Sequence, residues 1–408
     1  MRALTVSGDL IPRLLSGPPQ IPLSHLGDSD LCRQAGRPLE LVGSDGQFVG
    51  YAISDPENGV LRLYSLDSDD RPDDRLLARR LREAFLLRRQ LGLISENSVV
   101  DSAFRLVNGD GDRLSGFILE VYGEFVIQYA LAKGLQDWGR RLAQALASVA
   151  GEFGLKNRDG SAWPRGVVQK LRTKGSARPG KPTQSVVYGE SPPESYLVLE
   201  NGVPFEVHPL AGLNVGLFTD MREHRWRLGR FTDGARVLNL FAYTGALSVA
   251  SVLGGASRVT SVDLSSGVLK WAKANFGHAG LDPEGHAFVT SDVGQFLKRE
   301  VHSGGQYDFV IMDPPTYSAA RAASWSLKKD LSSLVERVLA ILADRGVFWL
   351  AVNRHQMSHS ELDREILTAS ERAGRRLHLI ESGGLPPDAP RDFTDRDADY
   401  LKVRIFRV

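Results

Sequence analysis

From residue 237 onward, short apolar runs alternate with amphipathic stretches in a regular rhythm. The apolar, β-branched runs predict strands, and the stretches with apolar residues at three- and four-residue intervals predict helices. The predicted strands span residues 237–241, 258–263, 287–290, 309–312 and 346–352, and the predicted helices span residues 245–253, 267–276, 293–301, 328–342 and 360–373. This alternation predicts an α/β fold with a mostly parallel sheet that binds ligands at the C-terminal ends of its strands. Two final apolar runs, 377–381 and 400–408, are expected to pair as an antiparallel edge.

The first half of the chain lacks this alternation. Residues 1–67 predict a β-rich unit with strands at 39–42, 48–53 and 60–66, separated by turn-forming residues. A mixed α/β region follows, with predicted helices at 74–91 and 135–149 and predicted strands at 116–122 and 124–129. Residues 156–194, rich in Gly, Pro, Ser and basic residues, predict a long loop with one or two short strands. We therefore expect a β-rich domain over 1–70, a central α/β domain over 71–195 and a Rossmann-like domain over 196–408.

The composition places few limits on function. The chain has 408 residues, of which 42% are hydrophobic and 24% charged, as in an ordinary globular protein. No apolar run approaches the roughly 20 residues that cross a bilayer, and the N-terminus lacks the pattern of a signal peptide, so a cytoplasmic location is expected. A single cysteine, Cys32, excludes an internal disulfide and a cysteine-rich metal site.

The net charge of +1 does not by itself indicate a nucleic-acid binder, but basic residues are clustered. Residues 71–89 carry seven arginines against three acids, and residues 221–230 carry four against one. Residues 165–181 carry no acid and six basic side chains: Arg165, Lys170, Arg172, Lys174, Arg178 and Lys181. Such clusters either neutralise phosphates or form solvated faces, and the sequence leaves both alternatives open.

A loop with one glycine follows the first predicted strand of the C-terminal half. The strand runs through Asn239 and Phe241 into Tyr243, Thr244 and Gly245, where a helix opens. A glycine there lets the backbone approach a ligand, and the helix N-terminus supplies unpaired N–H groups. Because the loop is not a GxGxxG sequence, it is weak evidence by itself, and a plain strand-turn-helix is the alternative.

Two aspartates end the next two predicted strands. Asp263 lies 24 residues after Asn239, where an acid accepts hydrogen bonds from the ribose hydroxyls of a nucleoside cofactor. Asp292 is placed to accept from an adenine amino group. Helix capping is the alternative for both aspartates, and Ser265 is a further candidate for a cap.

The sequence Asp313-Pro314-Pro315-Thr316-Tyr317 is the most specific feature of the chain. Two successive prolines force an extended backbone and remove two N–H donors. Carbonyl oxygens and the Asp313 carboxylate are then expected to face the mouth of a site, with the Tyr317 ring available to stack on a base. A proline turn that simply closes the strand is the alternative.

Four segments together resemble one family: residues 216–222, 238–245, 262–265 and 312–318. They are similar to the bacterial large-subunit ribosomal RNA methyltransferases that join a PUA domain, a small central domain and a Rossmann-like methyltransferase domain. The resemblance is strong over residues 200–408, extends through 108–116 in the central region and is faint over residues 1–70, which it implies are a PUA-like domain. Residues 10–26 contain one basic residue, Arg13, and no tryptophan, unlike the basic start usual in PUA domains of the family.

The resemblance implies that S-adenosylmethionine lies across the strand ends. Asp263 would hold the ribose, Asp292 the adenine, and Asp220 and Arg222 the methionine end. The expected cofactor set is completed by Asn239, Phe241, Tyr243, Thr244, Gly245, Ser265 and Asp313. The target base would meet Asp313, Pro314, Pro315 and Tyr317. Ribosomal RNA is the expected partner, residues 165–181 are a candidate contact for it, and a homodimer is a further expected arrangement.

One departure from the family bears on the reaction. Members that methylate cytosine C5 carry a cysteine after the strand that follows the Asp-Pro-Pro motif, and this cysteine attacks C6 of the ring. Asn353 stands at that position here, and an amide cannot form the adduct. A second branch, similar in residues 313–318 and in an asparagine followed by a basic residue, methylates guanine N7. Asn353 and Arg354 suit recognition of guanine, so base N-methylation at guanine N7 is preferred.

Other functions stay open from the sequence. Cytosine-C5 methylation by another route, a methyltransferase acting on a small molecule, and a catalytically silent RNA-binding protein all remain alternatives. An N6-adenine enzyme is less favoured, because Thr316 separates the aromatic residue from the second proline. His355 or His359 is either an acid–base residue or a surface histidine.

Overall fold

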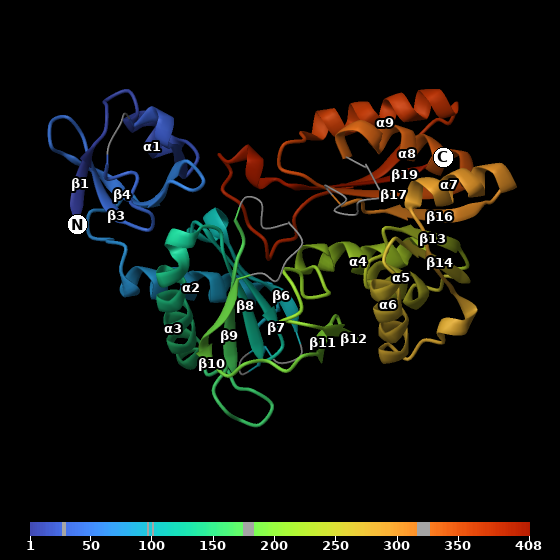
Figure 1. The fold of residues 1–408 in the computed structure, drawn as a ribbon, viewed down its shortest axis with the longest axis horizontal. Helices are drawn as coiled ribbons and strands as arrows, with labels where there is room; N and C mark the ends of the chain where they lie inside the picture. The colour runs from blue at the N-terminus through green and yellow to red at the C-terminus, as the bar shows by residue number, and fades with distance from the viewer. Residues whose placement is uncertain (27–29, 96–97, 100–101, 174–182, 316–326) are drawn as a thin grey trace. The chain divides into compact units, whose positions relative to one another are not determined.

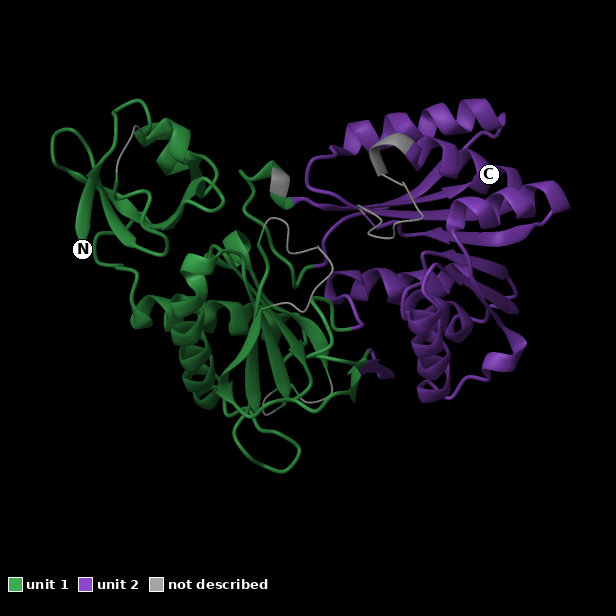
Figure 2. Cartoon of the chain, viewed as in Figure 1, with its two compact units in different colours: residues 1–200, 207–215, 387–398 green, residues 201–206, 216–386, 399–408 purple. Residues whose placement is uncertain are grey.

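The computed structural model describes residues 1–26, 30–95, 98–99, 102–173, 183–315 and 327–408 (Figure 1). The chain divides into two compact units, which Figure 2 distinguishes by colour. Unit 1 comprises residues 1–200, 207–215 and 387–398, and unit 2 comprises residues 201–206, 216–386 and 399–408. Two short segments from the second half of the chain therefore belong to unit 1. The expected domain boundaries at residues 70 and 195 stay predictions.

Unit 1 begins with a five-stranded sheet in the order β1-β3-β4-β5-β2. Its strands are β1 (Arg2–Thr5), β2 (Gln20–Pro22), β3 (Pro38–Val42), β4 (Phe48–Asp55) and β5 (Val60–Ser65), and helix α1 spans Ile11–Ser16. The three strands predicted from sequence are confirmed, whereas the short β1 and β2 were not predicted. Cys32 is buried in the core of this sheet. Its assignment to the PUA class stays a prediction.

The second sheet of unit 1 has the order β10-β9-β8-β7-β6. Its strands are β6 (Ala103–Asn108), β7 (Phe117–Tyr122), β8 (Phe125–Ala130), β9 (Gly166–Leu171) and β10 (Gln184–Gly189), and the helices are α2 (Asp74–Gln90) and α3 (Gln136–Glu152). Both predicted helices are confirmed. The predicted loop over residues 156–194 carries two strands, as expected. One of them, β9, is fully buried and lies inside the sheet, so this part of the loop is core rather than surface.

A buried arginine anchors the segment 387–398 within unit 1. Arg88 of α2 is fully buried and binds both carboxylate oxygens of Asp112, at 2.5 and 2.9 Å. The same guanidinium donates to the backbone oxygens of Arg105 and Asp388, at 2.9 and 2.8 Å. The Asp388 carboxylate in turn accepts the backbone N–H of Arg105 at 3.0 Å. Because a buried charge is stable only when it is paired and fully hydrogen-bonded, this network holds the segment in place.

The chain reaches unit 2 through the strands β11 (Tyr196–Glu200) and β12 (Val203–Val207). Unit 2 is built on a seven-stranded sheet in the order β15-β14-β13-β16-β17-β19-β18. The strands are β13 (Arg236–Leu240), β14 (Arg258–Asp263), β15 (Ala287–Thr290), β16 (Tyr307–Met312), β17 (Leu342–Asn353), β18 (His378–Gly383) and β19 (Leu401–Arg407). The five predicted βα strands are confirmed, and they pair in parallel.

The last two strands differ from the prediction in one respect. They do pair antiparallel, as expected, but β19 lies inside the sheet between β17 and β18. Four of the seven residues of β19 are apolar and six are buried, which suits an interior strand. β18, whose residues are largely exposed, is the edge strand on this side of the sheet.

Helices cover both faces of the unit 2 sheet (Figure 1). Helices α7 (Val293–Ser303), α8 (Leu327–Ile341) and α9 (His359–Ala373) pack their apolar residues in one cluster with Leu238 and Leu240 of β13. Helices α4 (Arg222–Leu228) and α5 (Ala246–Leu253) contribute to a second cluster that contains Val237, and α6 (Ser266–His278) packs next to α5. Because side chains alternate between the faces of a strand, this division gives a Rossmann-like layered α/β domain.

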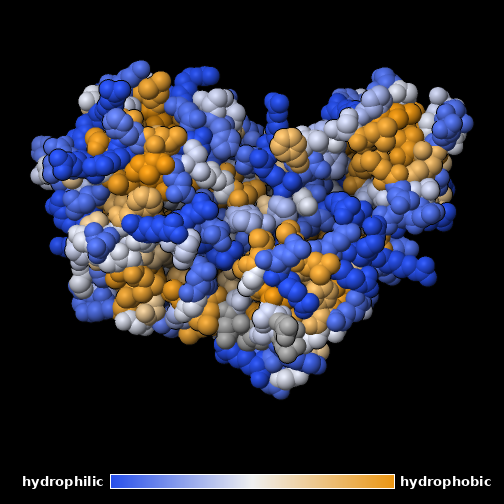
Figure 3. All heavy atoms as spheres, turned by 180° about the vertical axis from the view of Figure 1, so that it is seen from behind, coloured by the Kyte–Doolittle hydropathy of each residue, from blue (hydrophilic) through white to orange (hydrophobic). Residues whose placement is uncertain are grey.

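On the face drawn in Figure 3, hydrophobic residues gather in patches among polar ones. The exposed large hydrophobic residues include Leu379 and Ile380 of the edge strand β18. Among the described residues, no helix combines the length and the apolar character that a bilayer-spanning segment needs.

Replacing Arg88 with Met is expected to lower the free energy of unfolding by about 3–5 kcal/mol, because the Asp112 carboxylate would stay buried without its guanidinium. Urea denaturation measures the change. Arg140→Met is the matched control, because Arg140 pairs with Asp137 on the exposed face of α3 and should contribute less than about 1 kcal/mol. Equal effects of the two substitutions would contradict the structural role given to Arg88.

Candidate functional site

The C-terminal ends of β13, β14, β16 and β17 meet along one edge of the unit 2 sheet, because these strands are parallel neighbours. The residues that follow them are the loop after β13, Asp263 at the end of β14, Asp313 after β16 and Asn353 at the end of β17. This edge therefore gathers residues that are up to 112 positions apart in sequence, from Phe241 to Asn353.

The loop after β13 has an unusual backbone. Phe241, Tyr243 and Gly245 have φ angles of 59°, 47° and 75°, and the first two are not glycine. Left-handed backbone at such residues costs free energy and persists only where the surroundings enforce it. Here the Ala242 N–H donates to Val262 at 3.0 Å, and a Cβ atom on Gly245 would lie 2.7 Å from the Cβ of Ala272. The loop is thus fixed between β14 and α6 at the start of α5.

The Asp263 carboxylate reaches across to this loop. One oxygen accepts the N–H of Tyr243 and the other accepts the N–H of Ser265, both at 3.0 Å. An ionised carboxylate has about four lone-pair sites, so acceptor capacity remains for ligand hydroxyls. Ser265 caps α6, accepting the N–H of Val268 at 3.4 Å.

Two further predicted residues hold secondary structure together. Asn239 is fully buried, and its amide donates to the hydroxyl of Ser248 in α5 at 2.8 Å. The Ser248 hydroxyl in turn lies 2.8 Å from the hydroxyl of Ser261 in β14. Asn239 thus lies within the domain core below the strand-end edge, and it positions α5 and β14. Asp292 caps α7, accepting the N–H of Gln295 at 2.9 Å. The capping alternative is therefore observed for Asp292 and Ser265.

The segment that carries Asp220 lies against the same loop. The hydroxyl of Thr244 donates to the backbone oxygen of Gly216. The backbone oxygen of Thr244 accepts a hydrogen bond from the side-chain amide of Asn275 at 2.9 Å. Gly216 has a φ of 111°, and a Cβ atom there would lie 2.2 Å from the Trp271 ring, so only glycine fits. Two residues on, Phe218 packs its ring 5.4 Å from that of Tyr243, a contact that no sequence pattern predicted. Burial raises the pKa of Tyr243 to about 12, so its phenol stays neutral.

The carboxyl group of Asp313 lies close enough to that of Asp220 to feel its charge. Burial raises the pKa of Asp313 to about 7, the charge of nearby Asp220 adds to this rise, and Arg225 opposes it. Asp220 itself is buried and accepts the phenol of Tyr400 at 2.8 Å. Arg222, the first residue of α4, is largely buried and pairs with Glu223 at 2.9 Å.

The start of β19 brings Tyr400 to this edge. Leu401 pairs with Asn353 because β19 runs antiparallel to β17, so the residue before β19 lies beside the end of β17. The Arg354 N–H donates to the Tyr400 backbone oxygen at 2.8 Å, and the ring of His355 lies 5.0 Å from that of Tyr400. Sequence reasoning missed Tyr400, since it lies 180 positions from Asp220 and its only signal is its place before the last strand.

The structure also places the other residues predicted at this edge. Asn353 is exposed at the end of β17, Pro314 is buried and Pro315 is exposed. The sequence Thr316-Tyr317-Ser318 lies outside the described residues. Both ring nitrogens of His359 have hydrogen-bond partners, Asp399 at 3.0 Å and Arg404 at 2.9 Å. These contacts favour a structural role for His359 over an acid–base role.

The predicted RNA contact over residues 165–181 is corrected in part. Lys170 is fully buried in β9, where its ammonium group donates to the backbone oxygens of Gly212 and Leu213, and burial lowers its pKa to about 8. A buried, carbonyl-bound lysine is not available to a phosphate. Arg165 is half-buried among the carboxylates of Glu124, Asp159 and Glu190. Arg172 is exposed and lies over the Tyr129 ring, whereas Lys174, Arg178 and Lys181 lie outside the described residues.

Comparison with known proteins gives consistent matches. A family described as S-adenosylmethionine-dependent methyltransferase matches residues 158–407. The chain is 30% identical to the ribosomal RNA large subunit methyltransferase of Deinococcus radiodurans, over 88% of this chain and 85% of that one. It is 27% identical to the ribosomal RNA large subunit methyltransferase I of Aeromonas hydrophila, over 91% of each. Its structure is similar to that of SMU.776, a proposed methyltransferase crystallised with SAH, with a TM-score of 0.87, 26% identity and full coverage of both chains.

Replacing Tyr400 with Phe is expected to lower the free energy of unfolding by about 1–3 kcal/mol, because the buried Asp220 carboxylate loses a donor. Thermal and urea denaturation measure it. Tyr307→Phe is the matched control. Tyr307 is the first residue of β16, and its phenol donates at 3.0 Å to Glu300, which is less buried than Asp220. If Tyr307→Phe destabilises the protein as much as Tyr400→Phe, the burial of Asp220 does not increase the contribution of its hydrogen bond to stability.

Proposed function

Because the chain belongs to the family of S-adenosylmethionine-dependent methyltransferases, we propose that it methylates a base of large-subunit ribosomal RNA, with guanine N7 as the acceptor. The names of its relatives from Deinococcus radiodurans and Aeromonas hydrophila support the RNA substrate. The observation that carries the choice of atom is Asn353, an amide at the end of β17 where cytosine-C5 enzymes of similar sequence have a cysteine. Cys32, the single cysteine, is buried in the core of the N-terminal sheet.

The strand-end residues fit a nucleoside with a sulfonium group. Asp263 keeps acceptor capacity for ribose hydroxyls, and the loop of Phe241 to Gly245 is held in a conformation that lets a ligand approach its backbone. Asp292 would face the adenine, and Asp220 with Arg222 the methionine end. S-adenosylmethionine supplies an activated methyl group when bound, and the residues of this chain bind and orient it.

Guanine N7 suits a site without a thiol. Its lone pair is free in the neutral base, so it forms the new bond to the methyl carbon as the carbon–sulfur bond breaks. The positive charge passes from sulfur to the purine and no proton is released, so no general base is needed. Positioning then provides most of the rate enhancement, since a correctly oriented pair of reactants avoids a large entropic cost.

Asn353 and Arg354 offer the hydrogen-bonding groups that would recognise guanine. Asn353 is exposed at the strand end, and an amide both donates and accepts. The Nε atom of Arg354 is buried without a hydrogen-bond partner among the described residues, which is costly unless a ligand supplies an acceptor. Guanine presents O6 and N7 as acceptors on one edge, and arginine commonly donates to O6.

The product of the reaction tests the proposal. The full-length protein is incubated with labelled S-adenosylmethionine and ribosomal RNA from a strain that lacks the gene, and the nucleosides are analysed by mass spectrometry. We expect 7-methylguanosine at one site. A product of 5-methylcytidine would contradict the argument from Asn353. Cofactor binding without transfer to RNA would favour a silent RNA-binding protein, and transfer to metabolites alone would favour a small-molecule enzyme.

The rate of methyl transfer is expected to rise with pH through about 7 and then level off. The pKa of Asp313 is raised to about 7, so its carboxylate is ionised mainly above that pH and can then stabilise the positive charge that develops on the purine. Single-turnover rates measured across this range test the expectation. Asp313→Asn should remove the rise and lower the rate. A flat profile for the unsubstituted protein would contradict the role given to Asp313.

A further inference from the structure

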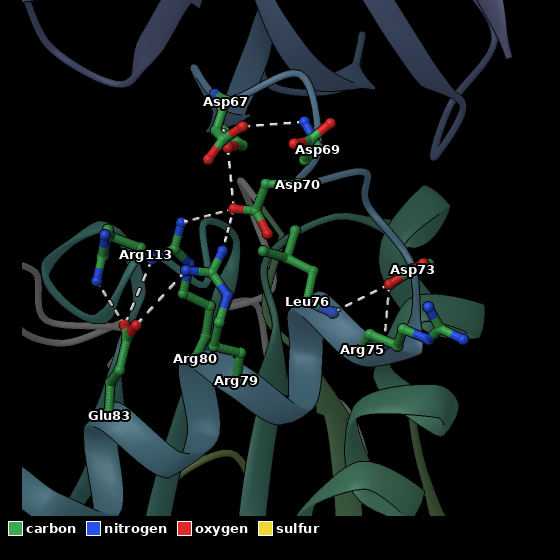
Figure 4. Close-up of polar contacts among 11 residues, drawn as sticks. Asp67, Asp69, Asp70, Asp73, Arg75, Leu76, Arg79, Arg80, Glu83 and Arg113 are labelled. Atoms are coloured by element: carbon green, nitrogen blue, oxygen red, sulfur yellow. Dashed lines mark hydrogen bonds and ion pairs between the residues drawn. The ribbon is translucent and has the colours of Figure 1, made fainter.

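An arginine cluster lies where the chain enters α2. We define the arginine cluster as Arg79 and Arg80 of α2 and Arg113, together with the acids Asp70 and Glu83 (Figure 4). Arg113 follows the short helix at Gly109–Asp112 with a φ of 56°, a left-handed backbone that is rare for arginine. The three guanidinium groups therefore come from two separate stretches of unit 1 and converge on two carboxylates.

The two acids are shared among the three arginines. Asp70 binds Arg79 closely and Arg80 at 3.3 Å. Glu83 binds Arg113 closely, Arg80 at 3.4 Å and Arg79 at 3.8 Å. Three of these five contacts are longer than a good charge-assisted hydrogen bond of roughly 2.7–2.9 Å. Arg80 is thus held between both acids without a short contact to either.

The arginine cluster carries more positive than negative charge. Among the ion-paired groups, three guanidinium groups face two carboxylates, an excess of one positive charge, while Asp67 and Asp69 lie on the far side of Asp70 (Figure 4). The side chain of Arg80 is only 4% exposed, and its Nε atom has no hydrogen-bond partner among the described residues. Burial, together with the charges of Arg113 and Arg79, lowers the pKa of Arg80 despite Glu83 and Asp70. A further anion at this place would relieve that imbalance.

Two of the arginines are open to such an anion. The side chains of Arg79 and Arg113 are 44% and 59% exposed, and each guanidinium has five N–H donors, most of which these contacts leave unused. We propose that the arginine cluster binds phosphate groups of the RNA substrate, with Arg79 and Arg113 as the contacts and Arg80 as the buried charge behind them. This inference rests on the proposed RNA methyltransferase function.

RNA is the partner that the chemistry favours. Planar guanidinium groups donate in pairs to phosphate oxygens, and successive phosphates of a backbone offer several such acceptors. The arginines of residues 71–89 form one of the basic clusters of the sequence. In residues 165–181, Lys170 is buried and Arg165 is ion-paired, and among the described basic residues of that range only Arg172 is exposed. The exposed donors of the arginine cluster are therefore the better supported contact.

Salt dependence of RNA binding tests the inference. Binding of the full-length protein to a large-subunit ribosomal RNA transcript is measured over a range of KCl concentrations. The double substitution Arg79→Gln with Arg113→Gln should weaken binding roughly tenfold or more and reduce the slope of log K against log salt by about one for each lost contact. Glu83→Gln should act in the opposite direction, because it removes a carboxylate that competes with phosphate.

The control removes the same charge elsewhere. Arg236→Gln with Lys273→Gln deletes two exposed, ion-paired cations of unit 2 and should leave the slope unchanged. S-adenosylmethionine affinity and thermal unfolding are compared to show that each variant is folded. If the Arg79 and Arg113 variant binds RNA like the unsubstituted protein, the inference is overturned while RNA methylation by that protein stands. If the unsubstituted protein neither binds nor methylates RNA, the proposed function fails with it.

Discussion

The direction of the strands in the unit 2 sheet determines where this protein can bind a ligand. Five neighbouring strands are parallel, so the residues after β13, β14, β16 and β17 emerge at one edge. β19 is antiparallel, so its beginning rather than its end lies there, and Tyr400 joins Asp263, Asp313 and Asn353. Reversing that one strand would place Tyr400 at the opposite edge, because a strand's two ends are separated by its whole length.

Burial then gives this edge its electrostatic character. Asp313 lies in a poorly solvated place near the charge of Asp220, which is unfavourable unless donors and cations compensate. Tyr400 donates to Asp220, and the charge of Arg225 opposes the rise in the pKa of Asp313. A carboxyl group that titrates near neutral pH is unusual and is more frequent at functional sites than elsewhere. The same partners that make the two carboxyl groups tolerable also fix their geometry.

The segments that carry Asp220 and Tyr400 continue in the chain from segments that belong to unit 1. Residues 207–215, held by the buried ammonium group of Lys170, lead directly into Gly216 and Asp220. Residues 387–398, held by Arg88, lead directly into Tyr400. In both cases a fully buried cation donates to backbone oxygens of the segment, and these hydrogen bonds replace the water that the cation loses on burial. Chain connectivity thus links anchors in one unit to site residues in the other.

The sequence by itself determined the alternating strands and helices of unit 2, the glycine loop and the aspartates at strand ends, because hydrophobic periodicity and local turn chemistry act over a few residues. Only the tertiary structure decided what lies far apart in sequence: Tyr400 against Asp220, β19 inside the sheet rather than at its edge, and Trp271 against Gly216. It also decided that Lys170 is a buried anchor, although composition made it look like a surface charge. The physical reason is the same in each case. Burial and pairing between remote segments depend on which surfaces exclude water together, and no local pattern encodes that.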